Sequence, residues 1–149
     1  MTRRSILLVE DNPDDEALAL RALSRNNLAV MVSVVRDGAE AIDYLFGTGP
    51  YASRGAIDPP TVVFLDIDLP KVNGLEVLRR LRAEEHTRCI PVVLFSSSRE
   101  ERDVLTGYQL GANSFVTKPV DYENYIETIW NLGSYWLKLN EPMPSIGRN

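Results

Sequence analysis

The sequence contains very few residues of the types that form cross-links and bind zinc. Its 149 residues include one cysteine, Cys89, and one histidine, His86. A single cysteine cannot form a disulfide within the chain, and the sequence shows no cluster of zinc ligands. We therefore expect a fold that is stabilised by its hydrophobic core alone, in a reducing cytoplasm.

Long hydrophobic runs are also missing. The longest runs, such as Leu28 to Val32 and Val62 to Leu65, are far shorter than the roughly 18 residues that a membrane-spanning helix needs. Arg3 and Arg4 precede a short apolar run that Glu10 interrupts, which is too short for a secretory signal. The sequence predicts no membrane segment and a cytoplasmic location.

Positive charge is scarce as well. The chain has 16 lysine and arginine residues against 21 acidic residues, giving a formal net charge of −5, and it has no basic stripe. A protein that binds nucleic acid needs clustered positive charge to replace the counterions of the phosphates. We expect protein partners and no nucleic acid.

The sequence does contain a regular alternation of short β-branched runs and segments of helical period. Strands are predicted at Ile6–Val9, Val30–Val35, Thr61–Leu65, Val92–Phe95 and Ser114–Val116. Helices are predicted to begin near Pro13, where Asn12 is the expected cap, and near Gly38, Gly74, Arg99 and Tyr122. This alternation predicts a flavodoxin-like, doubly wound α/β fold with helices on both faces of a parallel sheet of order 2-1-3-4-5.

The length fits one domain. We expect this domain to span residues 1–140, followed by a loose tail at 141–149. Two additions to it are predicted: a Gly- and Pro-rich loop at residues 48–60, and a last helix that extends from Tyr122 to about Leu139.

Acidic residues follow two of the predicted strands. Glu10 and Asp11 follow the first strand, and Asp66 and Asp68 follow the third. The topology brings these carboxylates to one edge of the sheet, where like charges about 5 Å apart repel by roughly 3 kcal/mol at an effective dielectric of about 20. A Mg²⁺ ion would relieve that repulsion. Each group alone also fits a plainer role, as a solvated helix start or a strand terminator.

Two further polar groups are predicted at the same edge. Ser96 to Ser98 follow the fourth strand, and Ser98 is the expected cap of the next helix. Lys118 follows the fifth strand, and a cis bond to Pro119 would hold its side chain inward, although the sequence does not show which isomer forms. A hydroxyl and an ammonium group beside carboxylates can both bind phosphoryl oxygens.

Taken together, these motifs resemble a response-regulator receiver domain over nearly the whole chain. The resemblance is carried by the acidic pair after the first strand, by Leu65-Asp66-Ile67-Asp68-Leu69-Pro70 with Asn73-Gly74, by Ser96, and by Lys118-Pro119. It implies a signalling switch that contributes catalytic groups to its own phosphorylation, in which Asp66 accepts a phosphoryl group from a histidine kinase.

The resemblance also implies a role for each residue of the site. Asp11 and Asp66 would bind Mg²⁺ directly, Glu10 through water, and Asp68 through its backbone carbonyl.

On the opposite side of the site, Ser96 would bind a phosphoryl oxygen, and Lys118 would pair with both the resting carboxylate and the phosphoryl group. Phe115 would be the aromatic switch residue, without the hydroxyl of the more common tyrosine.

The long loop and the extended last helix resemble single-domain regulators of bacterial and cyanobacterial phytochromes. A bacteriophytochrome is therefore the expected kinase, and the signal is expected to pass to a downstream protein by binding or by onward phosphoryl transfer. The stimulus, the target and the lifetime of the phosphorylated state are not defined by the sequence.

Two other functions also fit parts of the pattern. Asp66 and Asp68 resemble the paired aspartates of haloacid-dehalogenase-type phosphatases, but that family places them on its first strand. A pseudo-receiver scaffold is the other alternative, but it would not need Asp11, Asp66, Ser96 and Lys118 together.

The last helix has more apolar residues than one buried face requires. Tyr122, Ile126 and Ile129 are predicted to face the core. A second line is predicted to form a homodimer interface: Tyr125, Leu132, Tyr135, Trp136 and Leu139. Burial of this line against the chain's own domain is the alternative.

Overall fold

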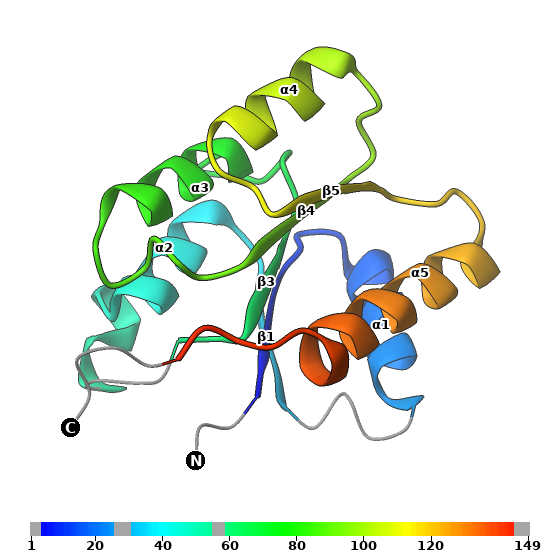
Figure 1. The fold of residues 1–149 in the computed structure, drawn as a ribbon, viewed down its shortest axis with the longest axis horizontal. Coiled ribbons are helices and arrows are strands. Elements are labelled where there is room, and N and C mark those ends of the chain that lie inside the picture. Colours follow the sequence, from blue (N-terminus) through cyan, green and yellow to red (C-terminus); the bar gives the residue numbers. More distant parts are fainter. Residues whose placement is uncertain (1–3, 26–30, 55–58, 145–149) are drawn as a thin grey trace.

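The computed structural model describes residues 4–25, 31–54 and 59–144, and these form the predicted flavodoxin-like fold (Figure 1). The five strands form one parallel sheet of order β2-β1-β3-β4-β5. The strands are β1 (Ile6–Val9), β2 (Val32–Val35), β3 (Val62–Leu65), β4 (Val92–Ser96) and β5 (Ser114–Thr117), and the helices are α1 (Pro13–Leu23), α2 (Gly38–Phe46), α3 (Gly74–Ala83), α4 (Glu101–Gln109) and α5 (Tyr122–Ser134). In the described part of the chain, no helix is long and apolar enough to cross a bilayer.

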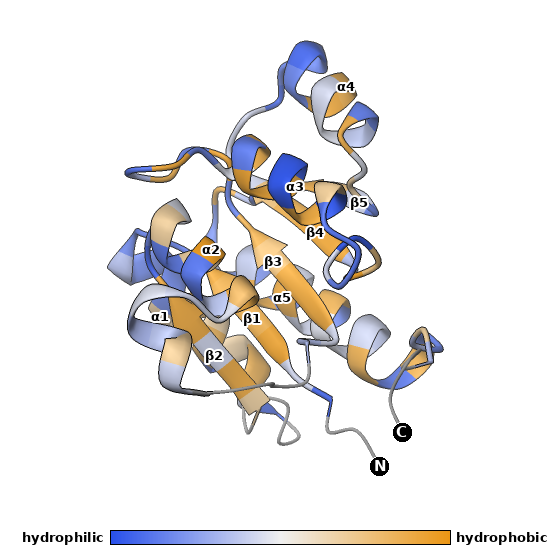
Figure 2. Ribbon diagram, turned by 90° about the vertical axis from the view of Figure 1, so that its left-hand side faces the viewer, coloured by the Kyte–Doolittle hydropathy of each residue, from blue (hydrophilic) through white to orange (hydrophobic). Residues whose placement is uncertain are grey.

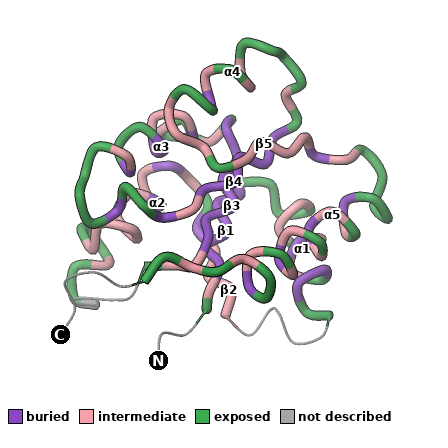
Figure 3. Tube along the Cα trace, viewed as in Figure 1, coloured by how far each residue is buried: buried purple, intermediate pink, exposed green. Residues whose placement is uncertain are grey.

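The central strands are apolar on both faces because helices cover both (Figures 1 and 2). Side chains alternate along each strand, so Ile6 and Leu8 join the core beneath α1 and α5, whereas Leu7 and Val9 join the core beneath α2 and α3. Figure 3 shows the resulting band of buried residues along the sheet. Helix α4 lies beside β5, on the same side as α3.

The predicted boundaries hold within a few residues. The Asn12 side chain accepts hydrogen bonds from the backbone nitrogens of Asp14 and Asp15, which confirms it as the cap of α1. Strand β2 begins at Val32; the predicted start at Val30 lies outside the described residues. Helix α4 begins at Glu101 instead of Arg99.

The predicted loop at 48–60 contains a 3-10 helix, η2 (Gly49–Arg54), and its residues 55–58 lie outside the described residues. Gly47 and Gly49 have φ angles of 67° and 56°, values that favour glycine. The Tyr51 ring packs edge-on against Tyr44 at 5.2 Å between centroids, and its hydroxyl donates to Glu40 Oε2 at 2.8 Å. These contacts dock η2 on α2.

The last helix has the predicted extent, and Ile126 and Ile129 pack in the core as predicted, but the positions of Tyr122 and Tyr125 were assigned wrongly. Tyr125 is 3% exposed and packs on Phe95 in the core, whereas Tyr122 is 72% exposed. Leu132 and Trp136 also pack against the core. The line from Tyr125 through Ile129 to Leu132 and Trp136 keeps steps of three or four residues, so it is the face that packs toward the sheet and α1.

Beyond Ser134 the helix continues as one π-helical segment, η3 (Tyr135–Leu139). The Asn140 nitrogen donates to the Tyr135 carbonyl at 2.7 Å, a step of five residues. The wider turn rotates the last residues, so that Leu137 is buried while Tyr135 and Leu139 are 46% and 76% exposed. Two residues of the predicted interface line thus remain well exposed.

Gly74 holds the start of α3 against the end of β3. A Cβ atom at this position would lie 2.0 Å from the Asp66 carbonyl oxygen, so only glycine fits without displacing the backbone. The Gly74 nitrogen donates to the Ile67 carbonyl at 2.8 Å. The backbone of Asp66 is therefore fixed by the first turn of the following helix.

Arg82, near the end of α3, ties that helix to the segments that enter β4 and β5. Its guanidinium donates to the Ile90 carbonyl at 2.8 Å, the Gly111 carbonyl at 2.9 Å and the Asn113 Oδ1 at 3.0 Å. Burial lowers the pKa of Arg82 from its usual value. No sequence pattern indicated this role, because the acceptors are distant along the chain.

We predict that Arg82→Met lowers the free energy of unfolding by about 2–3 kcal/mol, because it leaves partly buried acceptors without a donor. The matched control is Arg80→Met on the same helix, whose residue makes an exposed ion pair with Glu76 and should cost less than about 1 kcal/mol. Urea unfolding curves measure both. Equal losses would show that the Arg82 hydrogen bonds add no stability.

Candidate functional site

The carboxyl ends of β1, β3, β4 and β5 bring the predicted site residues to one edge of the sheet. Glu10 follows β1 and Asp66 follows β3, and the Asp66 nitrogen donates to the Val9 carbonyl at 3.3 Å. Ser96 ends β4, and Lys118 follows β5 and donates its backbone N–H to the Ser96 carbonyl at 2.8 Å. Parallel strands thus place four short motifs side by side.

Lys118 lies at the centre of this edge and contacts three carboxylates. Its Nζ is 2.7 Å from Glu10 Oε1, 2.9 Å from Asp66 Oδ2 and 3.1 Å from Asp15 Oδ2. Its side chain is 6% exposed. An ammonium group has three N–H donors, so these contacts use all of them.

Asp15 was not predicted as part of this site. It lies in the first turn of α1, where an acidic residue is ordinary, and its carboxylate nevertheless reaches Lys118. The Tyr125 hydroxyl donates to the Asp15 carbonyl at 3.3 Å. Helix α5 thereby supports the position of Asp15, a contact that links residues 110 positions apart.

The burial of these charges changes their acid–base behaviour. Burial raises the pKa of Glu10 to about 7, although the hydrogen bond and charge of Lys118 oppose the change. Burial by itself would lower the pKa of Lys118, but the hydrogen bond with Glu10 and the charge of Asp66 outweigh it and raise that pKa. Lys118 is therefore held in its charged form.

Glu10, Asp11 and Asp66 form an acidic metal site. Each offers a carboxylate oxygen, and these oxygens lie within 4.8 Å of one another. Glu10 and Asp66 are buried and Asp11 is exposed. Among the described residues, Lys118 is the cation that pairs with Glu10, Asp66 and Asp15, so carboxylates outnumber cations here. Hard oxygen ligands with excess negative charge fit a divalent cation.

Ser96 ends β4 and Phe115 lies in β5, and their roles in the switch stay predictions. Ser96 is fully buried, and its Oγ accepts a hydrogen bond from the Ser98 nitrogen at 3.2 Å. Phe115 is half-buried and packs against the core beneath α2 and α3. Its nitrogen donates to the Tyr108 hydroxyl of α4 at 3.2 Å. A Cβ at Gly107 would lie 3.4 Å from the Phe115 ring, so α4 approaches this ring closely.

Two predicted details of these loops were wrong or absent. Ser98 is not the cap of α4, because Glu100 occupies that position, although the Ser98 hydroxyl accepts from the Glu100 nitrogen at 3.3 Å. The described residues include no cis peptide bond, so Lys118–Pro119 is trans. Ion pairs with three carboxylates hold Lys118 inward instead.

Asp68 is exposed, and the group of carboxylates at the metal site does not include it. Its backbone remains adjacent to the site because it follows Asp66 by two residues. Its predicted role as a carbonyl ligand stays a prediction.

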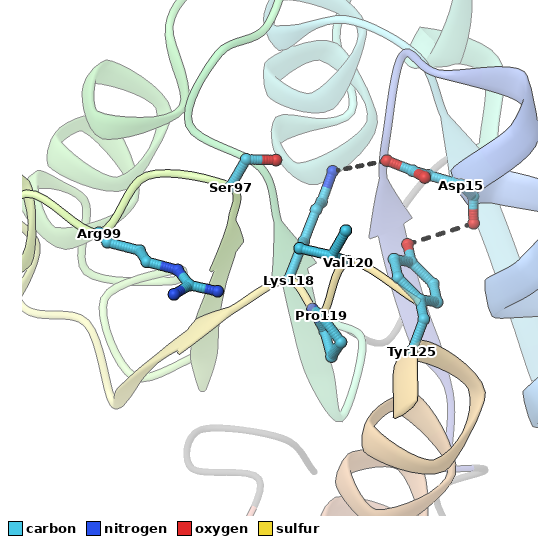
Figure 4. Close-up of a pocket in the computed structure, with 7 residues that line it drawn as sticks. All are labelled: Asp15, Ser97, Arg99, Lys118, Pro119, Val120 and Tyr125. Atoms are coloured by element: carbon cyan, nitrogen blue, oxygen red, sulfur yellow. Dashed lines mark hydrogen bonds and ion pairs between the residues drawn. The ribbon is translucent and has the colours of Figure 1, made fainter. Parts of the chain in front are cut away.

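A pocket of about 270 Å³ opens beside Lys118. Figure 4 shows its walls: the lining residues are Asp15, Ser97, Arg99, Lys118, Pro119, Val120 and Tyr125. The loop after β4 contributes one wall, and the loop after β5 with the starts of α1 and α5 contributes the other.

The protein-family model described as the response regulator receiver domain matches residues 6–129 of this chain. The chain belongs to this family. A receiver domain is a signalling switch and not a metabolic enzyme, so the haloacid-dehalogenase alternative is wrong. The acidic pocket at Glu10, Asp11 and Asp66 is the phosphoacceptor pocket of this receiver domain.

The chain is similar to a response regulator that has been solved with a bound metal ion. Response regulator Rcp1 of Synechocystis sp. is 32% identical over 89% of this chain and 88% of its own length. The crystal structure of its Mn²⁺-bound form covers 95% of this chain and 100% of that chain, with a TM-score of 0.87 and 30% identity. This receiver thus has a relative that binds a divalent cation.

Two other solved structures are similar. The phosphorylated cyanobacterial phytochrome response regulator RcpA has a TM-score of 0.88 and 34% identity and covers 97% of this chain and 100% of its own. The bacteriophytochrome response regulator AtBRR has a TM-score of 0.72 and 52% identity, with 95% and 100% covered.

We predict that the stability of the metal-free receiver falls as the pH rises from about 5 to about 8. Glu10 has a raised pKa of about 7 in the folded state, so the folded state retains a proton that the unfolded chain has already released. Glu10→Gln keeps the shape and removes this titration. The variant should lose less stability than the unmodified chain over this range, by on the order of 2 kcal/mol, as measured by urea unfolding in a chelator. If the free energy of unfolding changed with pH equally in the variant and in the unmodified chain, the raised pKa of Glu10 would be contradicted.

Proposed function

We propose that this receiver accepts a phosphoryl group from a histidine kinase on Asp66, with Mg²⁺ as its cofactor. The observation that carries the proposal is the contact of 2.9 Å between the buried Lys118 ammonium and Asp66 Oδ2, beside Glu10 and Asp11. A carboxylate held by a fixed cation at an acidic metal site is arranged to form an acyl phosphate.

Asp66 is positioned through both of its oxygens. Oδ1 accepts a hydrogen bond from the Ile67 nitrogen at 2.7 Å, and Oδ2 contacts Lys118. An Asp66 oxygen attacks the phosphorus atom, a P–O bond forms, and the P–N bond of the kinase phosphohistidine breaks, leaving its electron pair on the imidazole. Lys118 offsets the charge of the phosphoryl oxygens.

Glu10, Asp11 and Asp66 would hold the Mg²⁺ ion, and Asp68 would add its backbone carbonyl. When bound, the ion neutralises carboxylate and phosphoryl oxygens. The Ser96 hydroxyl accepts one hydrogen bond in the resting state, and its O–H is available to donate to a phosphoryl oxygen.

Movement of Ser96 toward the phosphoryl group would change the packing of Phe115. The ring lies between the sheet and α4, and its backbone bonds to Tyr108 of that helix. Repacking here would alter the surface of α4, β5 and α5, and a downstream protein would read the change or receive the phosphoryl group.

A phytochrome-type kinase is the proposed donor, and the cytoplasm the proposed location. The support for this donor is the similarity to RcpA and AtBRR, which are named as phytochrome and bacteriophytochrome response regulators. AtBRR is 52% identical and covers 95% of this chain, whereas the family match covers residues 6–129.

We predict that acetyl phosphate and an autophosphorylated phytochrome-type kinase both label the chain on Asp66, and that a chelator blocks labelling. Asp66→Asn should not be labelled, because an amide cannot form the acyl phosphate. Asp68→Asn is the control, since it removes a nearby charge but keeps the nucleophile. Intact-protein mass spectrometry measures the result. Full labelling of the Asp66→Asn variant would disprove the site, and no labelling of the unmodified chain would favour the scaffold alternative.

The homodimer through the last helix also stays a proposal, now restricted to its exposed residues. Tyr135 and Leu139 are 46% and 76% exposed, and apolar residues exposed near one another favour an interface. We predict that Tyr135→Ser with Leu139→Ser reduces the mass in light scattering to that of one chain. Leu105→Ser on α4, which is 58% exposed, is the control. A monomeric unmodified chain at tens of micromolar would refute the dimer.

A further inference from the structure

Lys118 cannot be the first cation that an incoming phosphodonor meets. All three of its N–H donors face carboxylates, at 2.7, 2.9 and 3.1 Å, and its side chain is 6% exposed. It can bind a phosphoryl oxygen only after one of these contacts breaks. The three carboxylates therefore largely neutralise the positive charge of Lys118 for a ligand that approaches from outside the site.

The phosphoacceptor site repels anions in this resting arrangement. Glu10, Asp11, Asp15 and Asp66 surround Lys118 or lie beside it, so acidic groups outnumber the one ammonium. A phosphodonor is itself an anion. Its approach is opposed by this charge, which a Mg²⁺ ion held by Glu10, Asp11 and Asp66 would offset only in part.

Arg99 is placed to be a further cation beside this site. It lies in the loop after β4, is exposed, and lines the same pocket as Lys118. Figure 4 shows its side chain extending from that loop toward the Lys118 and Pro119 side of the pocket. Among the described residues, it makes no ion pair with a carboxylate, unlike Arg102 of the next helix, which lies 3.6 Å from Glu100.

We infer that Arg99 is a positioning residue that captures the phosphate group of the phosphodonor and guides it to Asp66. A guanidinium presents a planar set of donors that matches phosphate oxygens. Ser97, which lines the same pocket, also has a hydroxyl. This inference rests on the proposed phosphorylation of Asp66 and adds a residue that the family motif does not include.

The chemical step itself is unchanged by this role. With acetyl phosphate as the donor, an Asp66 oxygen forms the new P–O bond, the P–O bond to the acetyl group breaks, and acetate leaves with the electron pair. Arg99 acts before this step, by raising the local concentration and fixing the orientation of the donor.

The test is the rate of Asp66 labelling in Mg²⁺ at low ionic strength, with Arg99→Gln and Arg99→Lys. At neutral pH acetyl phosphate is a dianion, whereas phosphoramidate is a monoanion. Arg99→Gln should lower the second-order rate constant for acetyl phosphate at least about fivefold and that for phosphoramidate by less, because steering depends on the charge of the ligand. Most of the loss in Arg99→Gln should come from a higher half-saturating concentration of acetyl phosphate. Arg99→Lys should recover much of the rate.

The matched control is Arg102→Gln, which makes the same change of charge nearby but outside the pocket lining. It should leave the labelling rate within about twofold of the unmodified value, and near 1 M salt, where the Debye length is about 3 Å, the Arg99→Gln effect should shrink. Unchanged thermal unfolding midpoints would exclude loss of structure.

Three results would overturn the inference while the proposed function holds: equal rates for Arg99→Gln and the unmodified chain, equal losses with both donors, or equal losses in Arg99→Gln and Arg102→Gln. A change confined to the decay of phosphorylated Asp66 would also overturn it. Failure of the unmodified chain to label at all would instead reject the proposed function.

Discussion

One ammonium group shared by three carboxylates holds the functional edge of this domain together. Removing charged groups from water costs several kcal/mol for each ion, and the contacts of Lys118 with Glu10, Asp15 and Asp66 offset part of that cost. Each carboxylate comes from a different part of the chain, after β1, in α1 and after β3. The site therefore forms only when the sheet and α1 are assembled, and folding and the capacity to react are linked.

The doubly wound sheet explains why so short a set of motifs predicted the site. Parallel strands must end at the same edge, so residues that follow strands in the sequence meet in space. This geometry was sufficient for Glu10, Asp66, Ser96 and Lys118. It was not sufficient for Asp15 or Arg82, because their partners are set by how helices pack, at separations of 103 and 31 residues.

The last helix shows a second limit of the sequence. Tyr122 and Tyr125 are both amphipathic, and their spacing to the following apolar residues allowed either to face the core. Tyr125 faces inward because its hydroxyl bonds to Asp15 and its ring packs on Phe95, which are contacts to other elements. The π-helical segment that follows is likewise invisible to a periodicity of 3.6 residues.

Gly74 packs closely against the Asp66 carbonyl, so the two sides of the phosphoacceptor differ in how firmly the backbone is held. On that side of the phosphoacceptor, the backbone is clamped by the first turn of α3, and a side chain larger than hydrogen has no room. On the other side, Ser96 and Phe115 are joined to α4 through loops and single hydrogen bonds. We therefore expect strain introduced at Asp66 to displace the side of α4 and β5, because the backbone on the other flank has no room to move.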